Sequence, residues 1–228
     1  MLRSGVSRLD DFLRLLDREP GRRRDLQRCL TVAVSEFFRT PQQFDHLATH
    51  ILPRLLGERG RLRIWSAGCS YGPEPYSLVL LLQQLTPERP HYLLATDIDE
   101  GALAKARAAD AFTERDLRNV TPQRRGEHFM PGRLSKHALH PRLRARVLFR
   151  RHDLLDEPPE ADFDLVVCRN VMMYFTAHAK GLLFENLHRA LRPGGYLFVG
   201  DAEVLNGLPE AGFFRDAVGF YRKEMGLS

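Results

Sequence analysis

The apolar positions of the first 58 residues follow the spacing of helices. They recur at intervals of three and four residues, which places them on one face of a helix. The pattern breaks at Pro20 and Gly21 and ends near Gly57, so it predicts three short helices. We expect a kink at Pro53 in the third, and we expect residues 1–58 to form a small helical N-terminal domain that packs on the rest of the chain. The positions that carry the pattern are Leu9, Phe12, Leu13, Leu16, Phe44, Leu47, Ile51 and Leu55.

From residue 59 onward, short apolar runs alternate with helical patterns. The runs are bounded by Gly, Pro and Asp, which is typical of buried strands. Strands that alternate with helices predict an α/β fold with a parallel, doubly wound sheet. The predicted strands are Leu62–Trp65, Tyr92–Thr96, Val147–Phe149, Asp164–Cys168, Tyr196–Val199 and Phe213–Arg222, and the predicted helices are Tyr76–Leu85, Gly101–Ala109 and Ala177–Leu191.

Composition excludes several classes of protein. The chain has 228 residues, of which 43% are hydrophobic and 28% charged, as in globular proteins. No apolar run approaches the ~18 residues of a membrane span, and the charged N-terminus lacks a signal-peptide core, so we expect no membrane insertion. The three cysteines, Cys29, Cys69 and Cys168, are too far apart for a disulfide scaffold, which favours the cytoplasm. His46 and His50 have the spacing of metal ligands, but no third ligand follows, so we expect no metal site.

Positive charge is concentrated in one segment of the chain. The net charge is +5, and Thr113–His152 contains eleven Lys or Arg and three Asp or Glu, which gives 11 − 3 = +8 for that segment. One interpretation is that this segment attracts an acidic protein, an anionic surface or a nucleic acid. The other is that it is a solvated surface without a partner, and both interpretations stay open. Only Phe129 and Phe149 are aromatic there, too few for single-strand binding, so nucleic acid is not expected.

The turn after the first predicted strand is the strongest physical indication of a binding site. Ligands of open α/β sheets lie beyond the carboxyl ends of the strands, and Gly68 and Gly72 allow the backbone to approach one. The turn is neither the dinucleotide fingerprint nor a phosphate-binding loop. Glu74 stands where a phosphate would need a cation, so a cationic or hydroxyl-rich ligand fits better. A tight strand–helix connection without a ligand remains the alternative.

Two carboxylates follow the next two strands. Asp97 ends the second strand, where a carboxylate can accept hydrogen bonds from both hydroxyls of a ribose. The alternative is helix capping, and we assign ribose to Asp97 and capping to Asp99. Asp153 ends the third strand, where it meets either an adenine amino group or solvent.

The fourth strand and the N-terminal part supply the remaining candidates. If a helical turn begins after Cys168, then Asn170 and Tyr174 share one face of it and point into the site; otherwise they are a cap and a core aromatic. In the segment Ser35–Arg39, two Phe residues are expected to dock on the main domain. A rigidly placed Arg39 would then suit a carboxylate, whereas a solvated Arg is the alternative.

Five blocks of the sequence together resemble the CheR-type methyltransferases of bacterial chemotaxis. These enzymes use S-adenosylmethionine to methylate glutamate side chains of chemoreceptors. The fourth block, with Cys-Arg-Asn-Val-Met-Met-Tyr-Phe, and the Glu-Pro-Tyr-Ser run of the second are the most specific. The blocks are Ser35–Arg39, Ile64–Leu80, Ala95–Ala106, Phe163–Phe175 and Leu191–Glu203.

The resemblance implies a fold and a set of site residues. The fold is a small helical N-terminal domain, here shortened, followed by a Rossmann-like methyltransferase domain over 59–228, with a small β-subdomain inserted at about 113–152. The implied substrate is the acidic helical bundle of a chemoreceptor cytoplasmic domain. Arg39 and Tyr174 would lie at the reaction centre. With the glycine turn, the implied S-adenosylmethionine contacts are Ser35, Arg39, Gly68, Glu74, Asp97, Asp153, Leu154, Arg169 and Asn170.

The chain departs from the family pattern at a few positions. Ala33 replaces an Asn, Ala202 replaces a Ser, and Pro73-Glu74 keeps one of two usual acids. One alternative is therefore a non-catalytic signalling module that binds S-adenosylmethionine, and another is a methyltransferase that acts on RNA. The presence of both Arg39 and Tyr174 favours a protein-glutamate O-methyltransferase.

Overall fold

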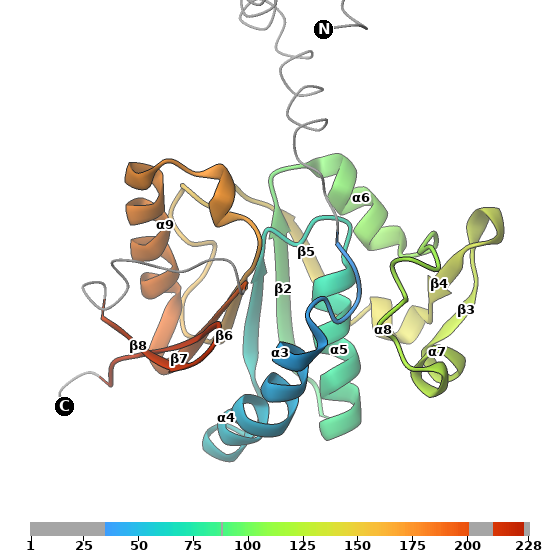
Figure 1. Ribbon diagram of the computed structural model, residues 1–228, viewed down its shortest axis with the longest axis horizontal. Coiled ribbons are helices and arrows are strands. Elements are labelled where there is room, and N and C mark those ends of the chain that lie inside the picture. Colours follow the sequence, from blue (N-terminus) through green and yellow to red (C-terminus); the bar gives the residue numbers. More distant parts are fainter. Residues whose placement is uncertain (1–34, 88, 201–211, 226–228) are drawn as a thin grey trace, which may run out of the picture. The chain divides into compact units, whose positions relative to one another are not determined.

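The computed structural model describes residues 35–87, 89–200 and 212–225 (Figure 1). The first predicted helix, residues 22–34 of the second, Ala33 and Ala202 lie outside the described residues. The second was expected to continue into the region up to Phe38, but residues 35–38 are not helical. The compact unit that contains the sheet begins at Ser35. The described part of the predicted N-terminal domain, 35–58, thus belongs to the same unit as the sheet, and the predicted division at residue 58 stays a prediction.

Within the described residues, a seven-stranded sheet has the order β5-β2-β1-β6-β7-β9-β8. The first five strands are parallel, so the predicted doubly wound sheet is confirmed. The segment predicted as one strand, Phe213–Arg222, forms two strands that pair as an antiparallel hairpin at the edge of the sheet. The strand predicted at Tyr196–Val199 begins earlier, at Leu191, because a bulge in its pairing with β6 accommodates Pro193-Gly194-Gly195. The strands are β1 Arg63–Ala67, β2 Tyr92–Asp97, β5 Leu148–Arg151, β6 Phe163–Cys168, β7 Leu191–Val199, β8 Phe213–Ala217 and β9 Phe220–Lys223.

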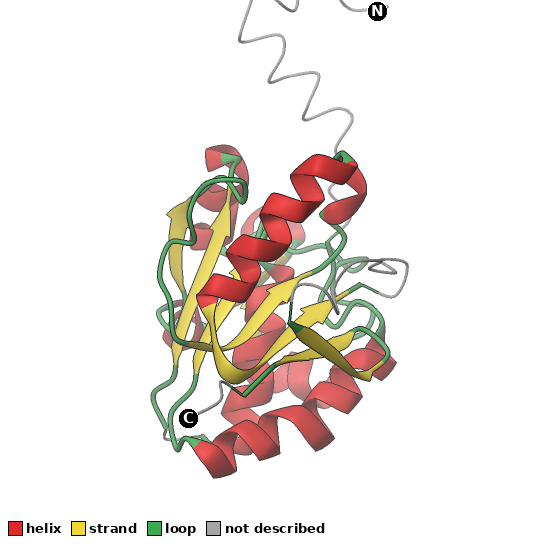
Figure 2. Cartoon of the chain, turned by 90° about the vertical axis from the view of Figure 1, so that its left-hand side faces the viewer, coloured by secondary structure: helices red, strands yellow, loops and turns green. Residues whose placement is uncertain are grey.

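Helices cover both faces of the sheet (Figure 2). One face packs against α5 and the α3–α4 helix, and the other packs against α9. Ile64 and Trp65 are adjacent in β1 and lie in different core clusters, as the alternation of a strand requires. The helices are α3 Pro41–His46, α4 Leu52–Glu58, α5 Pro73–Leu85, α6 Glu100–Ala108 and α9 Ala177–Ala190.

The predicted irregularity near Pro53 is present as a π-helical turn, η1 Leu47–Ile51, between α3 and α4. Pro53 has no amide hydrogen and cannot continue the regular hydrogen-bond ladder. The turn before it is wider, and the Leu52 N–H donates to the Leu47 carbonyl, five residues back.

The basic segment contains a small β unit. Its two-stranded antiparallel sheet, β3 Phe129–Pro131 and β4 His137–Leu139, lies apart from the main sheet (Figure 1). The 3-10 turn η2 Arg133–Ser135 joins its two strands, and α7 Pro122–His128 and α8 Pro141–Arg144 flank it in the chain. Strand β5 begins at Leu148, within the predicted insertion of 113–152, and it belongs to the main sheet.

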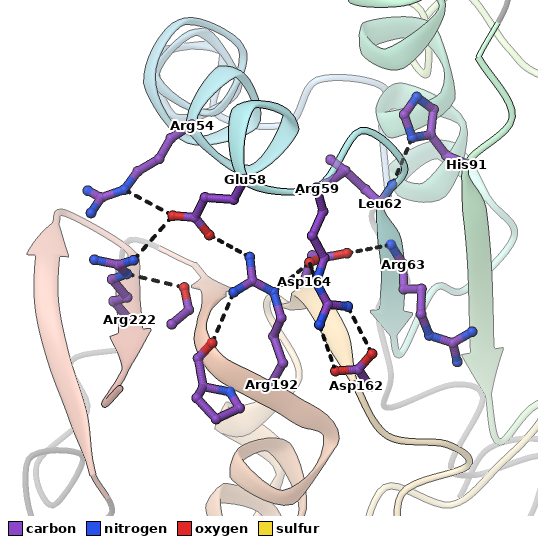
Figure 3. A network of polar contacts seen from close by, with 12 residues as sticks. Arg54, Glu58, Arg59, Leu62, Arg63, His91, Asp162, Asp164, Arg192 and Arg222 are labelled. Atoms are coloured by element: carbon purple, nitrogen blue, oxygen red, sulfur yellow. Dashed lines mark hydrogen bonds and ion pairs between the residues drawn. The ribbon is translucent and has the colours of Figure 1, made fainter. Parts of the chain in front are cut away.

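A buried ion-pair network lies at the amino ends of the parallel strands (Figure 3). Asp164 of β6 is fully buried; it accepts hydrogen bonds from Arg192 Nε at 2.6 Å and from the Arg63 backbone N–H at 2.8 Å. Arg192 also donates to Glu58 of α4 at 2.7 Å. The network therefore joins α4 to three neighbouring strands at the end of the sheet opposite their carboxyl ends.

Candidate active site

The carboxyl ends of β1, β2, β5 and β6 meet at one edge of the sheet. From the central β1, the chain builds β2 and β5 on one side and then returns to place β6 on the other. The strand order thus reverses between β1 and β6, and ligands of such sheets bind in the crevice at that point. The predicted site residues in or after these strands are Gly68, Glu74, Asp97, Asp153, Leu154, Arg169, Asn170 and Tyr174.

The Gly68 turn is fixed to the neighbouring strand. The N–H groups of Gly68 and Cys69 both donate to the Thr96 carbonyl, at 2.8 and 2.9 Å. Gly68 has a φ of 81°, and a Cβ there would lie 2.7 Å from Cγ2 of Val171. Gly68 is therefore required for close packing against the segment that follows β6, in addition to the role toward a ligand that its place in the turn predicts.

Asp97 is held in a defined orientation. Its Oδ2 accepts a hydrogen bond from the Ser70 N–H at 2.7 Å, and its Oδ1 accepts one from the Asp99 N–H at 2.9 Å. Burial raises the pKa of the Asp97 carboxyl, while these two N–H groups act in the opposite direction. Each carboxylate oxygen can accept further bonds, so the group is oriented to accept ligand hydroxyls. Asp99 accepts a hydrogen bond from the Gly101 N–H at 2.8 Å, which confirms its predicted capping role.

Glu74 lies in the first turn of α5, with its side chain 13% exposed. Ser66 Oγ donates to its Oε1 at 2.8 Å, and Arg169 Nη1 lies 3.8 Å from its Oε2. A carboxylate in the first turn is favoured by the helix dipole. The group is thus an oriented acid on the same edge of the sheet as Asp97.

Arg169 is buried directly after β6 and contacts other parts of the chain. Its Nη2 donates to the Arg39 carbonyl at 2.8 Å and to Gln43 Oε1 at 2.9 Å, and its guanidinium lies 4.6 Å from the ring centre of Phe198. It therefore holds the Arg39 backbone at the carboxyl-end edge of the sheet, while its direct contact with a cofactor stays a prediction. Sequence analysis missed Gln43, whose only signal was a polar residue on an otherwise apolar helix face.

Asn170 and Tyr174 do not share a helix face, so that prediction is wrong. The helical turn after β6 is the 3-10 helix η3 Met172–Tyr174, which begins after Asn170. Asn170 has a φ of 59°, a left-handed conformation that Asn tolerates better than most residues. Tyr174 is 52% exposed. Their roles at the reaction centre and toward the cofactor remain predictions.

The loop after β5 is fixed from α9. Asn186 Nδ2, which sequence analysis missed, donates to the carbonyls of Leu154 at 3.3 Å and Asp156 at 2.7 Å. Asp153 Oδ1 accepts a hydrogen bond from the Leu155 N–H at 3.0 Å, and the Leu154 side chain lies in the core. The predicted contacts of Asp153 and Leu154 with an adenine stay predictions.

The segment that carries Arg39 docks as the sequence predicts. Phe37 and Phe38 are both buried, and the Phe37 ring packs edge-on against Phe112 at 4.9 Å between ring centres. The Phe38 N–H donates to Ser77 Oγ of α5 at 2.9 Å. With the Arg169 bond to its carbonyl, Arg39 is attached to the same edge of the sheet as the acids.

The chemistry of these groups discriminates between ligand classes. Two oriented acids, Glu74 and Asp97, suit hydroxyl and ammonium groups and repel phosphates, so the residues fit a nucleoside with a positively charged amino-acid part. Among the residues with described positions, no three His, Cys, Asp or Glu side chains are grouped to hold a metal ion. No helix in the same ranges is both long and apolar enough to cross a bilayer.

Comparisons with known proteins agree with this chemistry. A family model for the S-adenosylmethionine-binding domain of CheR methyltransferases matches residues 33–216. A chemotaxis protein methyltransferase from Listeria monocytogenes is 41% identical over 179 residues, which cover 78% of this chain and 68% of the relative. Chemotaxis protein methyltransferase 1 from Pseudomonas aeruginosa is 34% identical over 220 residues, which cover 92% of this chain and 80% of the relative.

The chain also resembles solved methyltransferase structures. A TehB-like S-adenosylmethionine-dependent methyltransferase from Corynebacterium glutamicum aligns with a TM-score of 0.45 and 19% identity, over 80% of this chain and 93% of that one. Family membership rests on the family model, which spans most of the chain, and on the two relatives, which align over most of their own length. The chain therefore belongs to the CheR family of S-adenosylmethionine-dependent methyltransferases.

Proposed function

We propose that this chain is a cytoplasmic enzyme that transfers a methyl group from S-adenosylmethionine to glutamate carboxylates of chemoreceptors, forming glutamate methyl esters. The observation that carries the proposal is the position of Arg39 at the edge of the sheet that also holds Glu74 and Asp97. Arg169 fixes it there by donating a hydrogen bond to the Arg39 carbonyl. An Arg held beside a nucleoside site suits an incoming carboxylate, because its planar fork can orient both oxygens.

The reaction needs positioning rather than a base. The bound cofactor supplies a methyl group on a positively charged sulfur. A glutamate side chain has a pKa of about 4.3 and is already an ionised nucleophile at neutral pH. Arg39 orients that carboxylate and Tyr174 lines its approach, while Glu74 and Asp97 hold the cofactor. An Arg that clamped the carboxylate would stabilise the ground state as much as the transition state, so Arg39 serves to aim it.

The basic segment supports an acidic protein as the substrate. Four of its cations form ion pairs, which leaves fewer charges for a partner than the +8 of the sequence indicates. Arg115, Lys136 and Arg142 make no ion pair within the described ranges and can steer an acidic helical bundle toward the site. The ion-paired cations are Arg118, Arg125, Arg133 and Arg150.

The same segment offers little to RNA. Stacking of unpaired bases needs exposed aromatic rings. Phe129 packs edge-on against Phe37 at 5.2 Å, and Phe149 packs against Tyr76 at 5.8 Å, between ring centres. Both aromatic rings of the segment are thus engaged in the core, which favours a protein substrate over the alternative of RNA.

The test is methyl transfer to receptor fragments. With labelled S-adenosylmethionine and native membranes or purified cytoplasmic receptor domains, we expect label to enter the receptor and to be released by mild alkali, as from a methyl ester. Alkali-stable label would indicate a different acceptor atom, and nuclease-sensitive label would indicate RNA. Binding of S-adenosylmethionine without transfer to any of these would favour the non-catalytic signalling module.

Acidification is expected to weaken cofactor binding through Asp97. Burial raises the pKa of this carboxyl, so it takes up a proton at a higher pH than an ordinary aspartate. The protonated group is a poorer acceptor for ribose hydroxyls. Calorimetric titration with S-adenosylhomocysteine should therefore show affinity falling on acidification, starting at a higher pH than an ordinary aspartate would give. In Asp97→Asn, binding should be weaker and this part of the pH dependence absent; an unchanged profile would remove Asp97 from the ribose site.

A further inference from the structure

The segment Ser35–Arg39, here called the arginine segment, is held along its whole length by other parts of the chain. Each of its five residues has a bond to a group far away in sequence. The holding groups are the Tyr71 hydroxyl on the Ser35 carbonyl, Arg118 on the Glu36 carboxylate, the Asp116 carbonyl on the Phe37 N–H, Ser77 Oγ on the Phe38 N–H, Asn119 Nδ2 on the Phe38 carbonyl, and Arg169 on the Arg39 carbonyl.

The backbone of this region needs such holding. Phe38 has a φ of 50°, and Thr40, directly after Arg39, has a φ of 61°. Both residues are in the left-handed region, where a non-glycine residue costs of order 1–3 kcal/mol and persists only if its surroundings enforce the conformation. Arg39 thus lies between two strained residues, and its direction depends on the groups that fix the segment.

Tyr71 and Asp116 form the centre of this holding arrangement. The Tyr71 hydroxyl is shared between the Ser35 carbonyl and Oδ1 of Asp116, the latter at 2.9 Å. Asp116 Oδ2 accepts a hydrogen bond from the Thr113 N–H at 2.7 Å, and its carbonyl accepts one from the Phe37 N–H at 2.9 Å. The Asp116 carboxylate therefore fixes the loop whose backbone in turn fixes the arginine segment.

Tyr71 also connects this arrangement to the cofactor side of the crevice. It lies in the turn between Gly68 and Gly72, next to Ser70, whose N–H donates to Asp97 at 2.7 Å. Burial raises the pKa of the Tyr71 hydroxyl, so the group keeps its proton and remains a donor at physiological pH.

We infer that Tyr71 and Asp116 are positioning residues for Arg39. Through these two residues, the turn between Gly68 and Gly72 and the loop at Thr113–Asn119 fix the direction in which Arg39 points, and Arg39 in turn orients the substrate carboxylate. The inference rests on the proposed function of Arg39. Without the shared hydroxyl, the start of the arginine segment loses one anchor, and Arg39 spends less time in the productive orientation. The expected cost falls much more on kcat than on cofactor affinity.

The first measurement compares two tyrosines that differ in the bond they make. Tyr71→Phe removes the shared hydroxyl, and Tyr76→Phe removes a buried hydroxyl that donates to the Ala106 carbonyl at 2.7 Å, away from the arginine segment. We expect Tyr71→Phe to lower kcat by about tenfold, with affinity for S-adenosylhomocysteine within about twofold. Tyr76→Phe should leave kcat unchanged. Equal effects of the two variants on kcat would overturn the inference.

The second measurement asks whether the effect passes through Arg39. In an Arg39→Lys background, Tyr71→Phe should lower kcat by less than about twofold. The guanidinium that Tyr71 helps to orient is already absent there, so the loss of the Tyr71 hydroxyl has little further effect on the rate. The same fold-loss in both backgrounds would overturn the inference. Asp116→Ala should behave like Tyr71→Phe. Asp116→Asn should largely restore kcat, because its amide can accept from Thr113 N–H and donate to the Tyr71 oxygen.

A third measurement needs no substrate. Hydrogen exchange of the Phe37 amide should be faster in Tyr71→Phe than in wild type and Tyr76→Phe, because its acceptor, the Asp116 carbonyl, lies on the loop that the Tyr71 hydroxyl joins to the arginine segment. Unchanged exchange would overturn the inference even if receptor methylation is found. Faster exchange together with no methyl transfer by wild type would refute the proposed function while leaving the role of Tyr71 in place. If Asp116→Ala does not fold, Tyr71→Phe carries all three measurements.

Discussion

Arg39→Ala is expected to lower the rate of receptor methylation by about 100-fold or more, because loss of orientation at the reacting atoms has effects of that size. Arg39→Lys should recover only part of the rate, since an ammonium group lacks the planar fork that aligns both carboxylate oxygens. We expect Arg39→Ala to weaken cofactor binding as well. Tyr174→Phe should lower the rate while leaving cofactor affinity nearly unchanged. The measurements are initial rates with labelled S-adenosylmethionine and calorimetric affinities for S-adenosylhomocysteine.

A matched control for Arg39→Ala is Arg54→Ala. Arg54 is 47% exposed and lies in α4, where it pairs with Glu58 at the opposite end of the sheet from the crevice. Its loss removes one positive charge and one exposed ion pair, so the rate should stay near that of wild type. Full activity in Arg39→Ala would mean that the arginine segment serves packing alone and that another group orients the substrate.

Local sequence patterns were sufficient for the sheet and for several site residues. Apolar runs and turn residues define the strands because buried parallel strands carry a continuous hydrophobic signal. The capping role of Asp99 depends on a bond to Gly101, two residues away, and was predictable for that reason. The docking of Phe37 and Phe38 followed from adjacent aromatic residues, which seldom remain exposed.

What the sequence could not show is how distant residues meet. The roles of Tyr71, Asp116 and Gln43 depend on partners 36, 45 and 126 positions away, and nothing in the local pattern specifies those pairs. The error at Asn170 and Tyr174 has a different cause: a left-handed residue delays the helical turn, and a period of 3.6 was assumed where a short 3-10 turn forms. Backbone conformation at a single residue thus decided which side chains share a face.

The second large effect concerns stability. Asp164→Ala is expected to lower the free energy of unfolding by about 3–5 kcal/mol, because it removes one partner of a buried ion pair. Arg192, only 9% exposed, would lose the carboxylate 2.6 Å from its Nε and keep Glu58, and the Arg63 N–H would lose its acceptor. Denaturant unfolding followed by circular dichroism and by tryptophan fluorescence, with coincident transitions, measures the change.

Asp162→Ala is the matched control, since Asp162 also pairs with an arginine, Arg59 at 2.9 Å, but its side chain is 59% exposed. An exposed pair contributes about 0–1 kcal/mol, so the two alanine variants should differ by several-fold in their cost. A similar small cost for both would mean that Glu58 alone satisfies Arg192. Because the Asp164 network lies at the amino ends of the strands, S-adenosylhomocysteine affinity of the folded Asp164→Ala protein should match wild type (Figure 3). A loss of affinity without unfolding would show that the network also shapes the crevice at the other end of the sheet.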